Sequence, residues 1–241
     1  MATLMGRKIV IVGGSSGIGL GVAAATVKAG SKVVVVGRSM ERLKTARETL
    51  AAEDRVTALA ADMTQEREIV RLFDVVGVFD HLVSTAGSPP PGNPIDHTDI
   101  DDVRDFIDNK FIGAVLLAKH AVRGLSRGGS MTFTSGINKD KPPVPGGAVV
   151  AAIAGSFSYL AHALSLELAP TRVNVVSPGW VDTPCSTHWP ARRRRCISTV
   201  WPPVCPLVAL QRRPISRLPI FTRWKAILPP ARPFISMAAR A

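Results

Sequence analysis

Acidic residues are absent from the last 57 residues of this 241-residue sequence, from Cys185 to Ala241. That segment holds 11 of the 30 Lys and Arg residues and 9 of the 19 Pro residues. The first 184 residues hold 19 basic and all 18 acidic residues, so they are nearly neutral. The formal net charge of +12 therefore belongs to the tail and does not by itself indicate a nucleic-acid partner for the rest of the chain.

Other scarcities exclude further classes of protein. Only three Cys are present, at positions 185, 196 and 205, and their spacing matches neither a disulfide framework nor a metal site. The N-terminus is short and polar before its first apolar strand, which does not resemble a secretory signal. The longest apolar stretch, 146–168, is interrupted by Ser, His and Glu, which favours a packing helix over a membrane span. We therefore expect a soluble cytoplasmic protein with no bound metal and no membrane partner.

Short β-branched runs alternate with helical segments as far as residue 184. The predicted strands are residues 8–12, 33–36, 56–60, 81–84, 131–134 and 173–176. The predicted helices are residues 17–29, 40–52, 66–75, 100–122 and 148–169. This alternation is typical of an α/β protein with a Rossmann-type, doubly wound parallel sheet. We expect one domain over residues 1–184.

A glycine-rich segment follows the first strand and opens the first helix. Glycines there permit a tight turn and the close approach of a pyrophosphate, which the free N–H groups of the helix N-terminus would bind. The predicted phosphate-binding residues are Gly13, Ser15, Ser16, Gly17, Ile18 and Gly19.

This Gly-x3-Gly-x-Gly spacing resembles that of the short-chain dehydrogenase/reductase family, and further matches follow it in order. They are the segments 61–63, 84–87, 167–170, 172–176 and 177–183, so that the resemblance covers residues 6–184. The segment 84–87 departs from the family pattern, because Ser and Thr replace its two Asn. The resemblance implies a Rossmann fold and cofactor contacts from Asp62, Met63, Ala86, Gly87, Pro178 and Gly179.

The end of the second strand predicts the type of dinucleotide. A carboxylate at position 37 would bind a ribose 2′-hydroxyl and repel a 2′-phosphate, but Gly37 stands there. Arg38 and Ser39 follow, and a guanidinium suits that phosphate. The alternative is that Arg38 is a solvated loop residue. We expect NADP(H) as the cofactor.

The residues that transfer protons in the family are missing. The position of the family's Tyr falls on Val150, and that of the Lys four residues later falls on Ala154. Tyr159, the only tyrosine, lies nine residues further along the same predicted helix and on its opposite face, so we expect a packing role for it.

Two other side chains are candidate catalytic residues. An ungapped match places the family's catalytic Ser on Gly136, but Ser135 stands beside it at the end of the fifth strand. Counting back from Gly113, the position of the family's active-site Asn falls on Lys110. If its ammonium points into the site, Lys110 would supply positive charge or a proton, with a pKa lowered by desolvation. The alternative is a surface lysine.

The acid-free tail, residues 185–241, has two interpretations. Back-translated codons shifted by two bases permit a continuation of the family pattern at three places in the right order. We therefore expect an out-of-frame, poorly ordered tail, with the last strand of the sheet missing and family-type homo-oligomerisation weakened. The alternative is a basic arm in which Arg192–Arg195 and nearby Trp residues bind nucleic acid.

The function that follows is hydride transfer between NADP(H) and a small-molecule carbonyl or alcohol. The alternative is a protein that binds NADP(H) as a sensor or structural partner and transfers no hydride. Substrate identity does not follow from the sequence.

Overall fold

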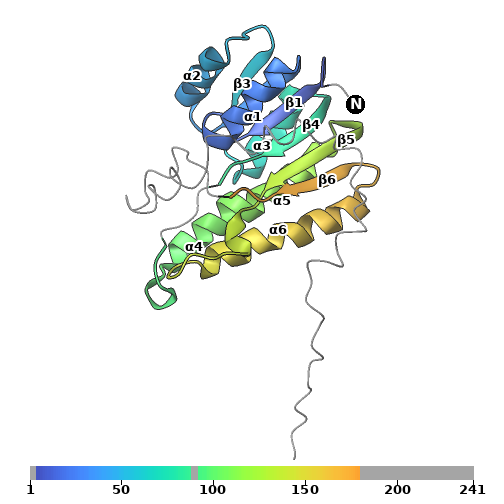
Figure 1. The fold of residues 1–241 in the computed structure, drawn as a ribbon. Coiled ribbons are helices and arrows are strands. Elements are labelled where there is room, and N and C mark those ends of the chain that lie inside the picture. Colours follow the sequence, from blue (N-terminus) through green and yellow to red (C-terminus); the bar gives the residue numbers. More distant parts are fainter. Residues whose placement is uncertain (1–3, 88–91, 180–241) are drawn as a thin grey trace, which may run out of the picture.

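The computed structural model describes residues 4–87 and 92–179, which build a parallel sheet with helices on its two faces (Figure 1). Its six described strands lie in the order β3-β2-β1-β4-β5-β6, and every neighbouring pair is parallel. Their bounds are β1 Lys8–Val12, β2 Lys32–Gly37, β3 Val56–Ala60, β4 Phe79–Ser84, β5 Leu125–Thr134 and β6 Arg172–Val176. The predicted doubly wound sheet is confirmed. The predicted loss of the last strand and the predicted tail lie outside the described residues.

Each crossover contains helix. The α-helices are α1 Gly17–Lys28, α2 Met40–Leu50, α3 Glu66–Val76, α4 Ile100–Ile107, α5 Gly113–Ala121 and α6 Ala148–Glu167. Single 3-10 turns occur at Ile95–His97 and Ile137–Lys139. The predicted and observed elements agree closely at most ends, since Gly and Pro mark where the strands and helices stop.

Apolar side chains form one packed layer on each face of the sheet, because successive side chains of a strand point to opposite faces. Ile9, Ile11 and Val35 pack with α1 and with Leu43 of α2. Val10, Val12, Val34 and Val36 face the other way, together with residues of α3 and α5 and with Phe157 of α6. Since both faces of β1 and β2 are buried, their sequences are continuous apolar runs.

The prediction of one continuous helix over residues 100–122 is wrong, because the structure interrupts it near the middle. A π-helical turn, Asp108–Ile112, separates α4 from α5 and contains Lys110. Such turns widen the helix by one residue and occur frequently at functional sites. Apolar periodicity alone does not register one extra residue in a turn.

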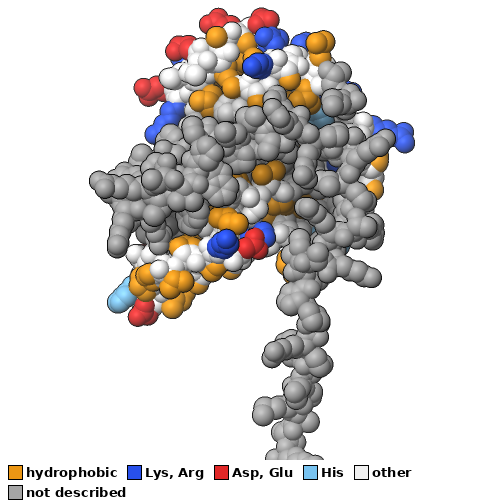
Figure 2. Space-filling model, viewed as in Figure 1, with side chains coloured by type: hydrophobic (Ala, Val, Ile, Leu, Met, Phe, Trp, Pro, Cys, Tyr) orange, Lys and Arg blue, Asp and Glu red, His pale blue; other side chains and the backbone are white. Residues whose placement is uncertain are grey.

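Helix α6 is long and apolar enough by composition to cross a membrane, and it is the one described helix that passes this test. In this fold it packs against β5 and β6 and buries Val150, Ala154, Phe157 and Ala161 against the sheet. Its role here is that of the packing helix expected from the sequence. Figure 2 shows charged side chains over the end of the molecule where α2 lies, whereas hydrophobic side chains dominate where α4 and α6 begin.

Candidate functional site

A cleft of about 660 Å³ lies at the carboxyl ends of β1, β2, β4 and β5. In open parallel sheets ligands bind at this edge, where the connections from two neighbouring strands run to opposite faces of the sheet and leave a crevice between them. Every site residue predicted from the sequence lines this cleft: Gly13, Ser15, Ser16, Gly17, Ile18, Gly19, Arg38, Ser39, Asp62, Met63, Ala86, Gly87, Lys110, Ser135, Pro178 and Gly179.

The glycine-rich turn between β1 and α1 is closed too tightly for side chains. A Cβ on Gly19 would lie 2.1 Å from the carbonyl oxygen of Gly13. Gly13 and Gly17 adopt φ angles of +84° and +54°, which side chains rarely allow. Ser16 precedes α1, and its side chain makes no capping hydrogen bond, which leaves the first N–H groups of the helix free to bind an anion.

Thr85 fastens this turn to the end of β4. Its Oγ1 lies 3.2 Å from the carbonyl oxygen of Val12 and 3.3 Å from that of Gly13, and donates toward them. A Cβ on Gly13 would come within 2.7 Å of the same Oγ1. The replacement of Asn by Thr at this position therefore preserves a polar link between the two strand ends.

Two arginines border the cleft beyond β2. Arg38 follows the strand directly, and Arg42 lies one helical turn later on α2. Between them, Ser39 caps α2 by accepting a hydrogen bond from the backbone N–H of Arg42 at 3.3 Å. Both arginines are exposed, so their guanidinium groups remain solvated and can bind an anion at little desolvation cost. Arg42 was not identified from the sequence, although its i, i+4 spacing from Arg38 was visible there.

Asp62 borders the cleft after β3. Its Oδ1 accepts hydrogen bonds from the backbone N–H and the hydroxyl of Thr64, each at 2.9 Å. The backbone N–H of Asp62 donates to Glu68 at 2.8 Å. These bonds hold the carboxylate in one orientation at the rim of the cleft. Met63 beside it is buried against Gly113, where a Cβ would lie only 2.5 Å from the Met63 side chain.

Lys110, the second candidate catalytic residue, lines the cleft. Its Nζ donates to the carbonyl oxygen of Ala86 at 3.0 Å and lies 5.4 Å from the ring centroid of Phe157. Its side chain passes over Gly87, where a Cβ would lie 2.5 Å from the Lys110 Cδ. Gly87, with a φ of +111°, therefore provides the space that this lysine occupies.

The environment of Lys110 changes its proton affinity. Burial lowers the pKa of its ammonium from 10.5 to about 8, because a charged group loses hydration there. Asp102 and Asp105 of α4 border the same cleft, but neither forms an ion pair with this lysine among the described contacts. The group is therefore a cation at neutral pH that gives up its proton more readily than a surface lysine.

The start of α6 is apolar where the family has its tyrosine and lysine. Val150 and Ala154 are 8% and 7% exposed. The Ser135 hydroxyl donates to the carbonyl oxygen of Ala154 at 2.6 Å, so it presents lone pairs to the cleft and not its proton. Gly136, the family's Ser position, lies next to it on the cleft wall. Tyr159 is 72% exposed, so the predicted packing role is wrong, because that face of α6 is turned to solvent in the described chain.

Asn138 is a cleft residue that the sequence did not identify. Its Oδ1 is buried and has no hydrogen-bond partner within residues 4–87 and 92–179. A buried unpaired acceptor is costly, and such an atom in a cleft is a ready partner for a ligand N–H or O–H. Lys139 next to it pairs with Asp140 at 2.6 Å. No group of three or more His, Cys, Asp and Glu side chains that could hold a metal ion occurs in the part of the chain described.

Comparison with known proteins places this architecture in a family. The family model described as short chain dehydrogenase matches residues 7–194. A short-chain dehydrogenase/reductase of Acremonium sp, ucsE, is 35% identical over 194 residues, with 73% of each chain covered. The cis-4-hydroxycyclohexanecarboxylate dehydrogenase of Sinomonas cyclohexanicum is 30% identical over 203 residues, covering 81% of this chain and 82% of its own. A solved small-chain dehydrogenase in complex with NADPH superposes with a TM-score of 0.63 at 31% identity, over 79% of this chain and 78% of its own.

Proposed function

This chain belongs to the short-chain dehydrogenase family, and we propose that it is an NADP(H)-dependent oxidoreductase that interconverts a small carbonyl compound and its alcohol. The observation that supports this most directly is that one cleft is lined both by the glycine turn and by Lys110. The relatives named dehydrogenases and the neighbour solved with NADPH support an enzyme over the alternative of a binding protein without chemistry.

The residues of the cleft fit NADP(H). The free N–H groups at the start of α1 and the close glycine turn suit the pyrophosphate. Arg38 and Arg42 suit a 2′-phosphate, since Gly37 presents no carboxylate to repel it. Asp62 would meet the adenine. The orphaned acceptor of Asn138 suits the amide N–H₂ of a carboxamide.

Bound NADPH would supply the hydride for the carbonyl carbon. As the oxygen gains negative charge, Lys110 would donate a proton from Nζ to it, leaving a neutral amine that takes a proton back from water. The Ala86 carbonyl oxygen and the Phe157 ring hold the ammonium in place. Ser135 would accept a hydrogen bond from the alcohol, because its own proton is already donated to Ala154.

The apolar start of α6 favours this assignment of Lys110. Neither Val150 nor Ala154 can transfer a proton, so the acid must come from elsewhere on the cleft. A pKa near 8 suits that task, since general acids work best when their pKa is close to the working pH. In this direction the reduction rate should fall as the pH rises through about 8.

The test is a fluorescence titration of the full chain with NADPH, followed by NADPH oxidation with a panel of ketones and aldehydes. Lys110→Met should lower the oxidation rate by about 10²- to 10⁴-fold and leave NADPH affinity nearly unchanged. Lys141→Met, an exposed lysine in the loop after β5, is the matched control. An unchanged rate in Lys110→Met would remove the lysine from the mechanism. NADPH binding without oxidation of any substrate would favour the sensor or structural alternative.

We also propose that residues 185–241 are translated out of frame, because none of these 57 residues is acidic and the family match ends within the segment, at residue 194. Resequencing the gene across codons 180–190 tests this. An intact reading frame would overturn it, and salt-sensitive DNA retention by the full chain would then favour the basic arm.

A further inference from the structure

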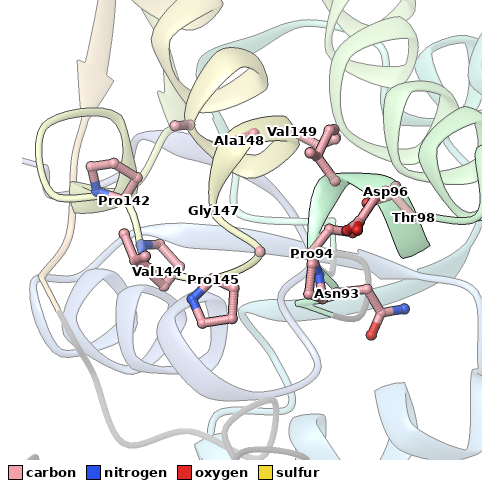
Figure 3. A pocket seen from close by; sticks show the side chains of 14 residues that line it. Asn93, Pro94, Asp96, Thr98, Pro142, Val144, Pro145, Gly147, Ala148 and Val149 are labelled. Carbon is pink, nitrogen blue, oxygen red and sulfur yellow. The ribbon is translucent and has the colours of Figure 1, made fainter.

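A second cavity, of about 480 Å³, lies beside the N-terminus of α6 (Figure 3). One wall is the segment after β4, from Asn93 to Thr98, and the other is the loop after β5 from Pro142 together with the first turn of α6. No residue of this cavity is shared with the cofactor cleft. Its volume is in the range of pockets that take small organic ligands.

The walls of this cavity are rigid and apolar. Pro94 stands on one side and Pro142, Pro143 and Pro145 on the other, and each proline ring fixes its own φ angle. The backbones of the two walls are in close contact, since a Cβ on Gly146 would lie 2.2 Å from the carbonyl oxygen of Gly92. The cavity is therefore preformed and presents proline rings, whose flat aliphatic faces suit another ring.

Large apolar side chains line it without being buried by the described chain. Val144 is 86% exposed and Ile95 is 71% exposed. Figure 2 shows hydrophobic side chains exposed among other atoms at the same end of the molecule, where α4 and α6 begin. Covering such surface with an apolar ligand is favourable, because it removes apolar area from water.

Few polar groups line the cavity, and they disfavour a negatively charged ligand. Asp96 is the one charged side chain among its described lining residues, is largely exposed, and lies 3.9 Å from the ring of His97. The hydroxyl of Thr98 donates to the carbonyl oxygen of Pro94 at 2.9 Å, so its proton is already used. A ligand carboxylate would meet a like charge and no cation from the lining.

The cavity reaches the first turn of α6, next to the position where the family has its tyrosine. Val149 and Ala151 line it and flank Val150, which stands at the family's tyrosine position on α6. Resting on the proposed function, we propose that this pocket binds the apolar body of the substrate and selects neutral, ring-bearing ketones over those that carry a carboxylate.

The first test uses a matched pair of probes, 4-tert-butylcyclohexanone and 4-oxocyclohexanecarboxylate, with the full chain saturated with NADP⁺. Binding measured by ligand-detected NMR titration should be at least about tenfold tighter for the neutral ketone. Asp96→Asn should narrow that preference to about threefold or less, because the repelling charge is gone. Equal binding of the two probes to the wild-type chain, or no binding of either while NADP⁺ is bound, would overturn the proposal.

The second test places a charge inside the pocket. Val149→Asp should weaken binding of the neutral ketone at least about tenfold, since the ligand would desolvate a carboxylate. The variant should fold, because an acidic residue in the first turn of a helix is favourable. Ala152→Asp is the control, being exposed on the same helix and outside the pocket lining. Equal ketone binding by the two variants would overturn the proposal, and loss of NADP⁺ binding by the wild-type chain would instead count against the proposed function.

Discussion

The turn after β1 and the start of α6 differ in what they keep of the family pattern. The turn retains its three glycines and its polar link through Thr85. The start of α6 retains its place against β5 and β6 but has Val150 and Ala154 where the family has its tyrosine and lysine. Both regions border the same end of the sheet, yet only the turn presents the family's usual groups.

This difference separates holding a cofactor from transferring a proton. The turn works through backbone N–H groups and close packing, so its function depends on the absence of side chains. Proton transfer depends on one ionisable atom, which any element facing the cleft can supply. In this chain the ionisable atom is the Nζ of Lys110, on the π-helical turn between α4 and α5.

The largest expected effect on NADPH affinity comes from breaking the turn. Gly19→Ala would place a Cβ 2.1 Å from the Gly13 carbonyl oxygen, so the turn must open. We expect NADPH affinity to fall by about a hundredfold or more in fluorescence titration, since the pyrophosphate contacts lose their alignment. Gly21→Ala is the control, because nothing lies within 4 Å of its Cβ position and alanine favours the helix. Similar NADPH affinity in the two variants would contradict this account of the turn.

A smaller effect is expected at the rim of the same region. Arg38→Ala should weaken NADPH binding by about ten- to a hundredfold and change NADH binding by less than about twofold, because only NADPH carries the 2′-phosphate. Arg42→Ala tests whether the second arginine on the rim shares this role. If both dinucleotides lose affinity equally in Arg38→Ala, the guanidinium does not read the phosphate and the choice of NADP(H) is wrong.

The smallest expected effect concerns the lysine and pH. Burial lowers the pKa of Lys110 to about 8. Below pH 8 the buried charge therefore lowers the free energy of unfolding by its full amount, and this loss disappears as the pH rises toward 10.5. Lys110→Met should therefore raise the free energy of unfolding by about 1–2 kcal/mol at pH 7, a gain that shrinks by pH 10. Thermal unfolding at the two pH values measures this, with the exposed Lys44→Met as control. A gain that does not depend on pH would show that the lysine is not desolvated.

Much of the fold followed from local patterns. The apolar run of β1 and the helix start at Gly17 were predicted at the residues where they occur. Both signals depend only on residues that are close together in the sequence. The beginning of β5 at Leu125 was missed, because its first residues pair with β4 through an irregular register. The π-helical turn was missed because one inserted residue leaves the apolar period intact on both sides.

By itself, the sequence determined the family, the sheet and the cofactor turn, because each depends on the order of short segments along the chain. It also determined that Val150 and Ala154 cannot transfer protons. Only the tertiary structure decided that Lys110 lies over Gly87 with a lowered pKa, and that Asn138 has an unpaired buried oxygen. Desolvation and hydrogen-bond satisfaction depend on which distant segments enclose a side chain, and no local pattern records that.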